Sequence, residues 1–123
     1  MDNTKIVITG GLGFIGSALT RFLFANTKSN LLLIDKMTYA SDMSAIKDIT
    51  QSQRVSYEKV SIGDSKRIEQ ILDLFQPDFI FNLAAETHVD KSILNPNIFI
   101  ETNVSDTHNF LLSTLKFYNS LNH

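Results

Sequence analysis

The sequence contains no cysteine and only two prolines among its 123 residues. Without cysteine, the chain cannot form a disulfide, a thiolate zinc site or a catalytic thiol. No apolar stretch approaches the roughly 20 residues that a transmembrane helix needs. The formal net charge is −2 and basic residues do not cluster, so we expect no nucleic-acid or membrane partner. The chain begins MDNTKIVITG, without the residue order of a secretion signal, which predicts a cytoplasmic protein.

Glycine is also scarce, yet its distribution is uneven. The chain has five glycines, and four of them lie between positions 10 and 16. Glycine weakens helices and strands, so such a cluster indicates a backbone that must turn tightly or approach another group closely. Hydrophobic residues make up 43% of the chain. This content and length predict one small domain with a single packed core.

Apolar residues form short β-branched runs that alternate with helical stripes. The predicted strands are Lys5–Thr9, Leu31–Asp35, Arg54–Val60 and Asp78–Ala85, of which the first, second and fourth are predicted to be buried. The predicted helices are Gly13–Asn26, a short weak one near Asp42–Ile49, Ser65–Phe75 and one that begins at Asn95-Pro96. Ser65 is the predicted cap of the third of these helices. The last helix carries an apolar stripe at Ile100, Val104, Leu111, Leu115 and Tyr118.

This alternation predicts an α/β fold with parallel strands and right-handed crossovers. We expect a Rossmann-type doubly wound parallel sheet of four strands in the order 3-2-1-4, with the third and fourth strands at its edges.

The segment TGGLGFIGS lies between the first strand and the first helix. In its Gly10-x-x-Gly13-x-x-Gly16 spacing, Gly10 permits the turn out of the strand. Gly13 lets a pyrophosphate approach the backbone, and Gly16 lets the helix pack closely. The phosphates would meet backbone N–H groups at the positive end of the helix dipole. The glycines alone are also compatible with a βα turn that binds nothing.

Asp35 supplies the second part of a dinucleotide signature. It ends the second strand, 19 residues after Gly16, where a carboxylate accepts hydrogen bonds from ribose hydroxyls. A carboxylate there repels a 2′-phosphate, so the sequence favours NAD over NADP. The neighbouring Lys36 weakens that preference without reversing it.

Four segments carry a family resemblance: TGGLGFIGS, IDKMTYA, NLAAETHVDKSI and FIETN. Together they resemble the extended short-chain dehydrogenase/reductase family of NAD-dependent epimerases and dehydratases. Within it they are most similar to the amino-terminal part of the dTDP-glucose 4,6-dehydratases. The resemblance implies NAD as cofactor, dTDP-glucose as nucleotide-sugar substrate, and a role in making deoxysugars such as rhamnose. A fragment of a related UDP- or GDP-sugar dehydratase or epimerase stays open.

The resemblance also implies which residues contact the cofactor and substrate. Phe14 and Ile15 would lie under the pyrophosphate, and Thr102 would contact the nicotinamide half. Thr87 corresponds to a position near the nucleotide-sugar. The full set of implied cofactor residues is Gly10, Gly13, Phe14, Ile15, Gly16, Asp35, Lys36, Thr38, Ser61, Ile62, Leu83, Ala84, Ala85, Glu86 and Thr102.

The sequence departs from the family pattern at three places. After the second strand it has Ala40-Ser41-Asp42 where the family has Ala-Gly-Asn. Ser61 stands before Ile62 where the family has an aspartate that reads the adenine amino group, so a charge-assisted hydrogen bond is lost there. Asp106 stands in the last helix where the family has glycine. A glycine inside a helix marks close packing, so Asp106 implies that its packing partner has moved or is absent.

Catalytic residues of the family have no counterpart in the sequence. The family uses a Tyr-x-x-x-Lys pair for redox chemistry and a Thr-Asp-Glu run for water elimination. None of the three tyrosines is followed by lysine four residues later, and the run does not occur. We therefore expect residues 1–123 to be the amino-terminal portion only of an NAD(P)-binding Rossmann domain, inactive alone. A non-catalytic nucleotide-binding or interaction module is the alternative.

Two further expectations concern metals and partners. Glu86, His88 and Asp90 alternate after a strand and need not converge on one ion, so we expect no metal site. We expect a homodimer that buries either the last helix or the edge of the fourth strand. The resemblance favours the helix, because the family dimerises through its counterpart.

Overall fold

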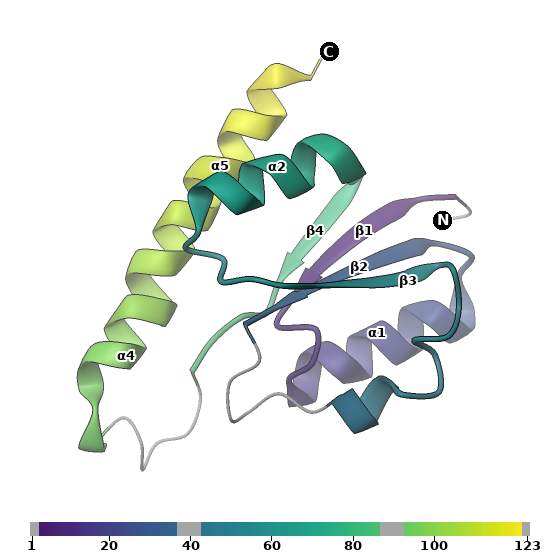
Figure 1. Ribbon diagram of the computed structural model, residues 1–123, viewed down its shortest axis with the longest axis horizontal. Helices are drawn as coiled ribbons and strands as arrows, with labels where there is room; N and C mark the ends of the chain where they lie inside the picture. Colours follow the sequence, from purple (N-terminus) through teal and green to yellow (C-terminus); the bar gives the residue numbers. More distant parts are fainter. Residues whose placement is uncertain (1–2, 37–42, 87–92, 122–123) are drawn as a thin grey trace.

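A parallel four-stranded sheet lies at the centre of the computed structural model, which describes residues 3–36, 43–86 and 93–121 (Figure 1). Its strands are β1 (Lys5–Thr9), β2 (Asn30–Asp35), β3 (Val55–Lys59) and β4 (Phe79–Asn82). All three neighbouring pairs are parallel, and the order is β3-β2-β1-β4. The predicted fold class and strand order are confirmed.

Helices cover both faces of the sheet. Helix α1 (Phe14–Asn26) lies on one face, and α2 (Ser65–Phe75) and α5 (Thr107–Ser120) lie on the other (Figure 1). A 3₁₀ turn, η1 (Met43–Ile46), lies beside α1. This layering follows from the strand alternation, which sends successive side chains to opposite faces.

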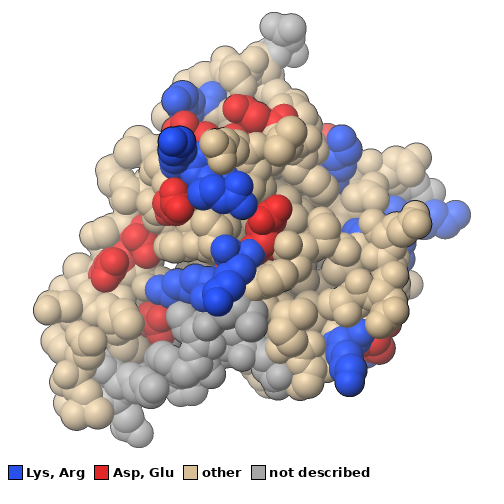
Figure 2. All heavy atoms as spheres, viewed as in Figure 1, with Lys and Arg blue, Asp and Glu red and all other residues tan. Residues whose placement is uncertain are grey.

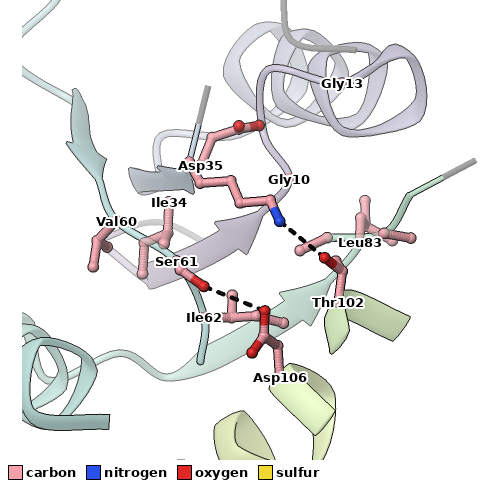
Figure 3. Close-up of a pocket in the computed structure, with 13 residues that line it drawn as sticks. Gly10, Gly13, Ile34, Asp35, Val60, Ser61, Ile62, Leu83, Thr102 and Asp106 are labelled. Carbon is pink, nitrogen blue, oxygen red and sulfur yellow. Dashed lines mark hydrogen bonds between the residues drawn. The ribbon is translucent and has the colours of Figure 1, made fainter. Parts of the chain in front are cut away.

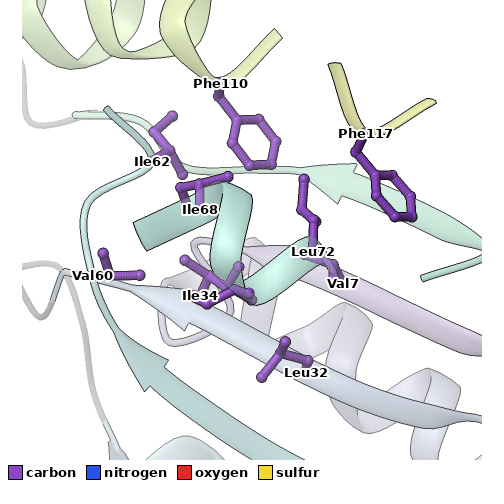
Figure 4. Packing of buried hydrophobic residues seen from close by; sticks show 10 residues of the cluster. Val7, Leu32, Ile34, Val60, Ile62, Ile68, Leu72, Phe110 and Phe117 are labelled. Carbon is purple, nitrogen blue, oxygen red and sulfur yellow. The ribbon is translucent and has the colours of Figure 1, made fainter. Parts of the chain in front are cut away.

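The core has one cluster on each side of the sheet. On the α2–α5 side, Val7 and Ile34 of the sheet are fully buried in a cluster with Leu72, Phe110 and Phe117 (Figure 4). The cluster on the other side joins Ile6 and Ile8 of β1 to Leu23 of α1. β1 is therefore covered on both faces, which suits a central parallel strand.

β4 differs from its prediction in length and in burial. It ends at Asn82 rather than Ala85, because its pairing with β1 ends where Thr9 faces Asn82. Phe79 is 51% exposed and Phe81 36% exposed, so the expectation of a buried strand is wrong. β4 lies at the sheet edge and pairs only with β1, so its side chains are less covered than those of a central strand.

The cap of α2 is also corrected. Asp64 is the N-cap, and its carboxylate accepts a hydrogen bond from the backbone N–H of Arg67 at 3.3 Å. Ser65, the predicted cap, is the first residue of the helix. A tight turn in which the Asp64 N–H donates to the carbonyl of Ser61 holds Asp64 just outside the helix. At the other end, Gln76 adopts a left-handed conformation before Pro77.

The last helical region is continuous but changes its winding. It comprises α4 (Pro96–Ile100), a π-helical segment η2 (Glu101–Asp106) and α5. Pro96 occupies the first helical position, as predicted. α5 buries Phe110, Ser113 and Phe117. The apolar stripe lies on other faces, since Ile100, Val104, Leu111, Leu115 and Tyr118 are each more than half exposed.

Charged side chains of both signs are mixed on the surface. Figure 2 shows lysine and arginine interspersed with aspartate and glutamate on the face viewed. Arg67 pairs with Glu58 at 3.1 Å, and Lys116 pairs with Glu69 at 3.2 Å. No helix among the described residues is both long and apolar enough to cross a bilayer.

Candidate functional site

A cleft opens where the four parallel strands end (Figure 3). The residues that line it are Gly10, Gly13, Ile34, Asp35, Lys36, Val60, Ser61, Ile62, Leu83, Ala84, Ala85, Thr102 and Asp106. Ligands of open α/β sheets bind at this edge, beside the strand where the chain reverses its order along the sheet. Here that strand is β1.

The glycine loop has little room for side chains. Gly10 has a φ of +65°, and a Cβ there would lie 2.7 Å from the backbone of Leu83. At Gly16, a Cβ would overlap the carbonyl of Gly10. Both positions therefore need glycine for the turn itself. Gly13 is different, because its Cβ would meet only the Gly10 carbonyl oxygen, at 3.3 Å.

The loop presents the start of α1 to the cleft. Gly13 is the N-cap and has no side chain to bond the first N–H groups of the helix. The first helical hydrogen bond of α1 runs from the Ser17 N–H to the Gly13 carbonyl. The preceding N–H groups have no helical acceptor, and they lie at the positive end of the helix dipole. This arrangement suits an anion.

Phe14 and Ile15 do not line the cleft. Their side chains are 92% and 68% exposed. The resemblance implies that these two residues lie under the pyrophosphate. Because their side chains do not line the cleft, their backbone N–H groups are the part that would face a phosphate there. Gly16 is buried beneath the loop and also forms no part of the cleft wall.

Asp35 ends β2 and is held in place. Its side chain is part of the cleft wall, the residue is 7% exposed, and its Oδ2 accepts a hydrogen bond from the Leu12 N–H at 3.2 Å. Burial and, to a smaller extent, the Asp35 charge raise the pKa of Tyr57 above its ordinary value. The fixed Asp35 carboxylate can accept hydrogen bonds from a diol.

Lys36 reaches across the cleft from the end of β2. Its Nζ donates a hydrogen bond to Thr102 Oγ1 at 2.8 Å, drawn as a dashed line in Figure 3. It also lies 3.6 Å from Glu86 Oε1, whose side chain is 1% exposed. Asn103 holds the Glu86 backbone through two hydrogen bonds, of 2.9 and 3.1 Å. Lys36 thus supplies the positive charge in the cleft and balances the buried carboxylate.

Two of the three departures from the family pattern, Ser61 and Asp106, are neighbours in space, and the third lies outside the described residues. The Ser61 hydroxyl donates to Asp106 Oδ2 at 3.4 Å, and it accepts from the Gly63 N–H at 3.1 Å. The Asp106 carboxylate packs against Gly63, where a Cβ would overlap it. In this chain, the packing partner of Asp106 is therefore Gly63. Asp106 was not predicted as a site residue. It lines the cleft with Thr102, and both belong to the π-helical segment η2, which the sequence did not predict.

Some predicted site residues lie outside the described residues or outside the cleft wall. Thr38 and Thr87 lie outside the described residues, as do His88 and Asp90. Glu86 is described, but it is buried behind Lys36 rather than in the cleft wall. Among the described residues, no three histidine, aspartate or glutamate side chains converge on a point that could hold a metal ion.

Comparison with known proteins shows that the chain is similar to nucleotide-sugar dehydratases. The sequence profile described as GDP-mannose 4,6 dehydratase matches residues 7–122. The chain is 45% identical over 117 residues to dTDP-glucose 4,6-dehydratase of Salmonella typhimurium and 41% identical over 118 residues to that of Shigella flexneri. These alignments cover 95% and 96% of the chain but 32% and 33% of the relatives. The chain thus spans about a third of their length.

Solved structures also resemble this one. The dTDP-glucose 4,6-dehydratase DesIV of Streptomyces venezuelae, with NAD and TYD bound, superposes with a TM-score of 0.87 at 30% identity. That match covers 94% of this chain and 37% of DesIV. The UDP-glucose 4-epimerase of Thermotoga maritima, with UDP-glucose, superposes with a TM-score of 0.80 at 26% identity, covering 93% of this chain and 35% of the epimerase.

Proposed function

The chain belongs to the GDP-mannose 4,6 dehydratase family, within the extended short-chain dehydrogenases/reductases, and on this basis we propose that it is the NAD-binding portion of a nucleotide-sugar dehydratase. The proposed sugar nucleotide is dTDP-glucose. The relatives from Salmonella typhimurium and Shigella flexneri, 45% and 41% identical to the chain, are dTDP-glucose 4,6-dehydratases, and this supports the choice.

One observation carries the proposal: an uncapped helix start and a fixed carboxylate face the same cleft. The first N–H groups of α1 suit a pyrophosphate, and Asp35 suits the hydroxyls of a ribose. The two features lie on adjacent strands, β1 and β2. A dinucleotide would therefore lie across the strand ends, with the nicotinamide half toward Leu83, Ala84 and Ala85. When bound, NAD supplies a hydride acceptor, and the residues of this chain bind and orient it.

The cleft also contains groups that favour an anionic ligand. The Lys36 ammonium is in the cleft and is 32% exposed. The position of Gly13 admits close approach to the backbone, since no side chain stands there. The residues present therefore fit the cofactor that the family uses. Asp35 disfavours the additional 2′-phosphate of NADP by charge repulsion.

A binding titration tests the proposal. We expect NAD to perturb the amide NMR signals of Gly10, Gly13 and Asp35, with a dissociation constant weaker than micromolar. Asp35→Ala should weaken binding, because the ribose hydroxyls lose their acceptor. Asp73→Asn is the matched control, since it removes an exposed carboxylate of α2 that is not among the residues lining the cleft. Unchanged spectra at millimolar NAD would overturn the proposal.

We propose that these residues alone do not catalyse dehydration. The sequence offers no tyrosine with a lysine four residues later, so it lacks the family's proton acceptor for the sugar hydroxyl. Incubation of the purified chain with NAD and dTDP-glucose should give no 4-keto-6-deoxy sugar. The second candidate is a non-catalytic nucleotide-binding module, and the departures from the family pattern at Ser61 and Asp106 favour it. An in-frame Tyr-x-x-x-Lys encoded after His123 would decide for the dehydratase.

We also propose that the chain forms a homodimer through its last helix. The apolar stripe of Ile100, Val104, Leu111, Leu115 and Tyr118 exposes more than half of each side chain. Sedimentation at tens of micromolar should show a dimer, and Leu111→Glu should dissociate it. A dimer that persists in Leu111→Glu but dissociates in Phe81→Lys would assign the contact to the β4 edge instead. A monomeric wild type would contradict both.

A further inference from the structure

Asp106 places a carboxylate in the wall of the cleft. The NAD site proposed above assigns no ligand contact to this carboxylate. It is part of the cleft wall together with Thr102, and both belong to the π-helical segment η2. Such segments are rare in helices and are frequent at functional sites. Asp106 comes from the helical region, whereas Asp35 comes from the sheet, so the two carboxylates approach the cleft from different elements.

The strand order indicates which part of a dinucleotide would reach Asp106. Phosphates are proposed at the end of β1 and the ribose at the end of β2, where Asp35 stands. The next strand outward is β3. The cleft continues past its end along Val60, Ser61 and Ile62. A base attached to that ribose would therefore lie beside these residues, on the side of the ribose away from the phosphates.

The surroundings of Asp106 suit the edge of a purine. Ile34, Val60 and Ile62 are at most 9% exposed and form an apolar part of the cleft wall. Ser61 and Asp106 lie beside this wall and are joined by the hydrogen bond drawn in Figure 3. A flat apolar ring with a hydrogen-bond donor on its edge matches such a site, because a carboxylate only accepts hydrogen bonds.

The carboxylate is held in one orientation. Ser61 donates to its Oδ2, and Gly63 packs against the group so closely that no Cβ would fit. The Ser61 hydroxyl in turn accepts a hydrogen bond from the Gly63 N–H. A carboxylate offers about four acceptor positions, so Asp106 keeps capacity for a ligand donor. A group held in this way loses little conformational freedom on binding.

We propose that Asp106 selects the base of the dinucleotide by accepting a hydrogen bond from the exocyclic amino group of adenine. This inference rests on the proposed NAD site and adds its specificity-determining residue. Hypoxanthine carries a carbonyl oxygen where adenine carries the amino group. That oxygen would face the Asp106 carboxylate without a hydrogen between them, so the base should be rejected.

The test compares NAD with its hypoxanthine analogue, deamino-NAD. We expect the wild-type chain to bind NAD about 10- to 100-fold more tightly, the value of a hydrogen bond to a charged group. Asp106→Asn should reduce this ratio to near one, because its amide group can donate to the carbonyl oxygen of hypoxanthine. Glu101→Gln is the matched control. It removes an exposed carboxylate from the same segment η2 outside the cleft, and it should leave the ratio unchanged.

Each outcome has a distinct meaning. Equal binding of the two dinucleotides by the wild type, or an unchanged preference in a folded Asp106→Asn, overturns the role of Asp106 and leaves the NAD site standing. If neither dinucleotide binds the wild type at millimolar concentration, the proposed function fails and the inference fails with it. Amide NMR spectra of each variant report directly whether the chain is folded. If Asp106→Asn does not fold, Asp106→Glu provides the second test: it keeps the charge but moves the carboxylate, and it should lower the ratio.

Discussion

Replacement of Gly13 by alanine separates a phosphate-binding loop from a simple turn between β1 and α1. Gly13 has φ −75° and ψ 177°, which alanine adopts without strain. Alanine has less conformational freedom than glycine in the unfolded chain, and at such a site this difference stabilises a protein by about 0.4–1 kcal/mol. The added Cβ would lie 3.3 Å from the Gly10 carbonyl oxygen, a tight contact that offsets part of this gain. We therefore expect the free energy of unfolding to change by less than about 1 kcal/mol.

Binding should respond much more strongly than stability. The methyl group would stand where a pyrophosphate approaches the N–H groups at the start of α1, and the loss of one charge-assisted hydrogen bond weakens affinity about 10- to 100-fold. Urea denaturation measures the stability, and an NMR titration with NAD measures the affinity. Gly16→Ala is the contrasting variant, because its Cβ would overlap the Gly10 carbonyl and should destabilise the fold. A stable Gly13→Ala that binds NAD as tightly as wild type would refute the phosphate-binding role.

Three further variants test other parts of the structure. Phe110 is 2% exposed in the core, and Phe110→Ala should lower the free energy of unfolding by about 3–5 kcal/mol in urea titrations, whereas a loss under 1 kcal/mol would contradict its packing. The Arg54 guanidinium donates to the carbonyls of Phe24, Thr27 and Ser29, so Arg54→Met should cost about 1–3 kcal/mol by the same measurement; unchanged stability would show that these bonds add nothing. The pKa of Tyr57 is raised in the folded state, so the neutral phenol is favoured there. Its contribution to stability is fully present below the pKa of an unfolded tyrosine, about 10, and is lost as the pH rises through the pKa of the folded state. Tyr57→Phe should therefore lose less stability than wild type between pH 9 and pH 11 in thermal melts, and parallel pH profiles would contradict the assignment.

Local pattern was enough to predict the sheet and the glycine loop. The β-branched runs and the helical stripes of a parallel α/β fold can be recognised from neighbouring residues alone. Right-handed crossovers then leave few possible strand orders. Gly10 and Asp35 were found because their roles depend on backbone conformation and on a fixed distance from a strand end. Both needs are local, so both leave a signature in the sequence.

The remaining features depend on contacts between segments far apart in the chain. β4 ends at Asn82 because β1 ends opposite it, and no property of the β4 sequence records where its partner stops. The apolar stripe of the last helix looked as suitable for a core as Phe110 and Phe117, and only packing against α2 decided which face is buried. Ser61 and Asp106 are 45 residues apart, and each alone was a departure from the family pattern. They meet only because the turn after β3 and the segment η2 lie side by side in the fold, and no local pattern in either segment records that contact.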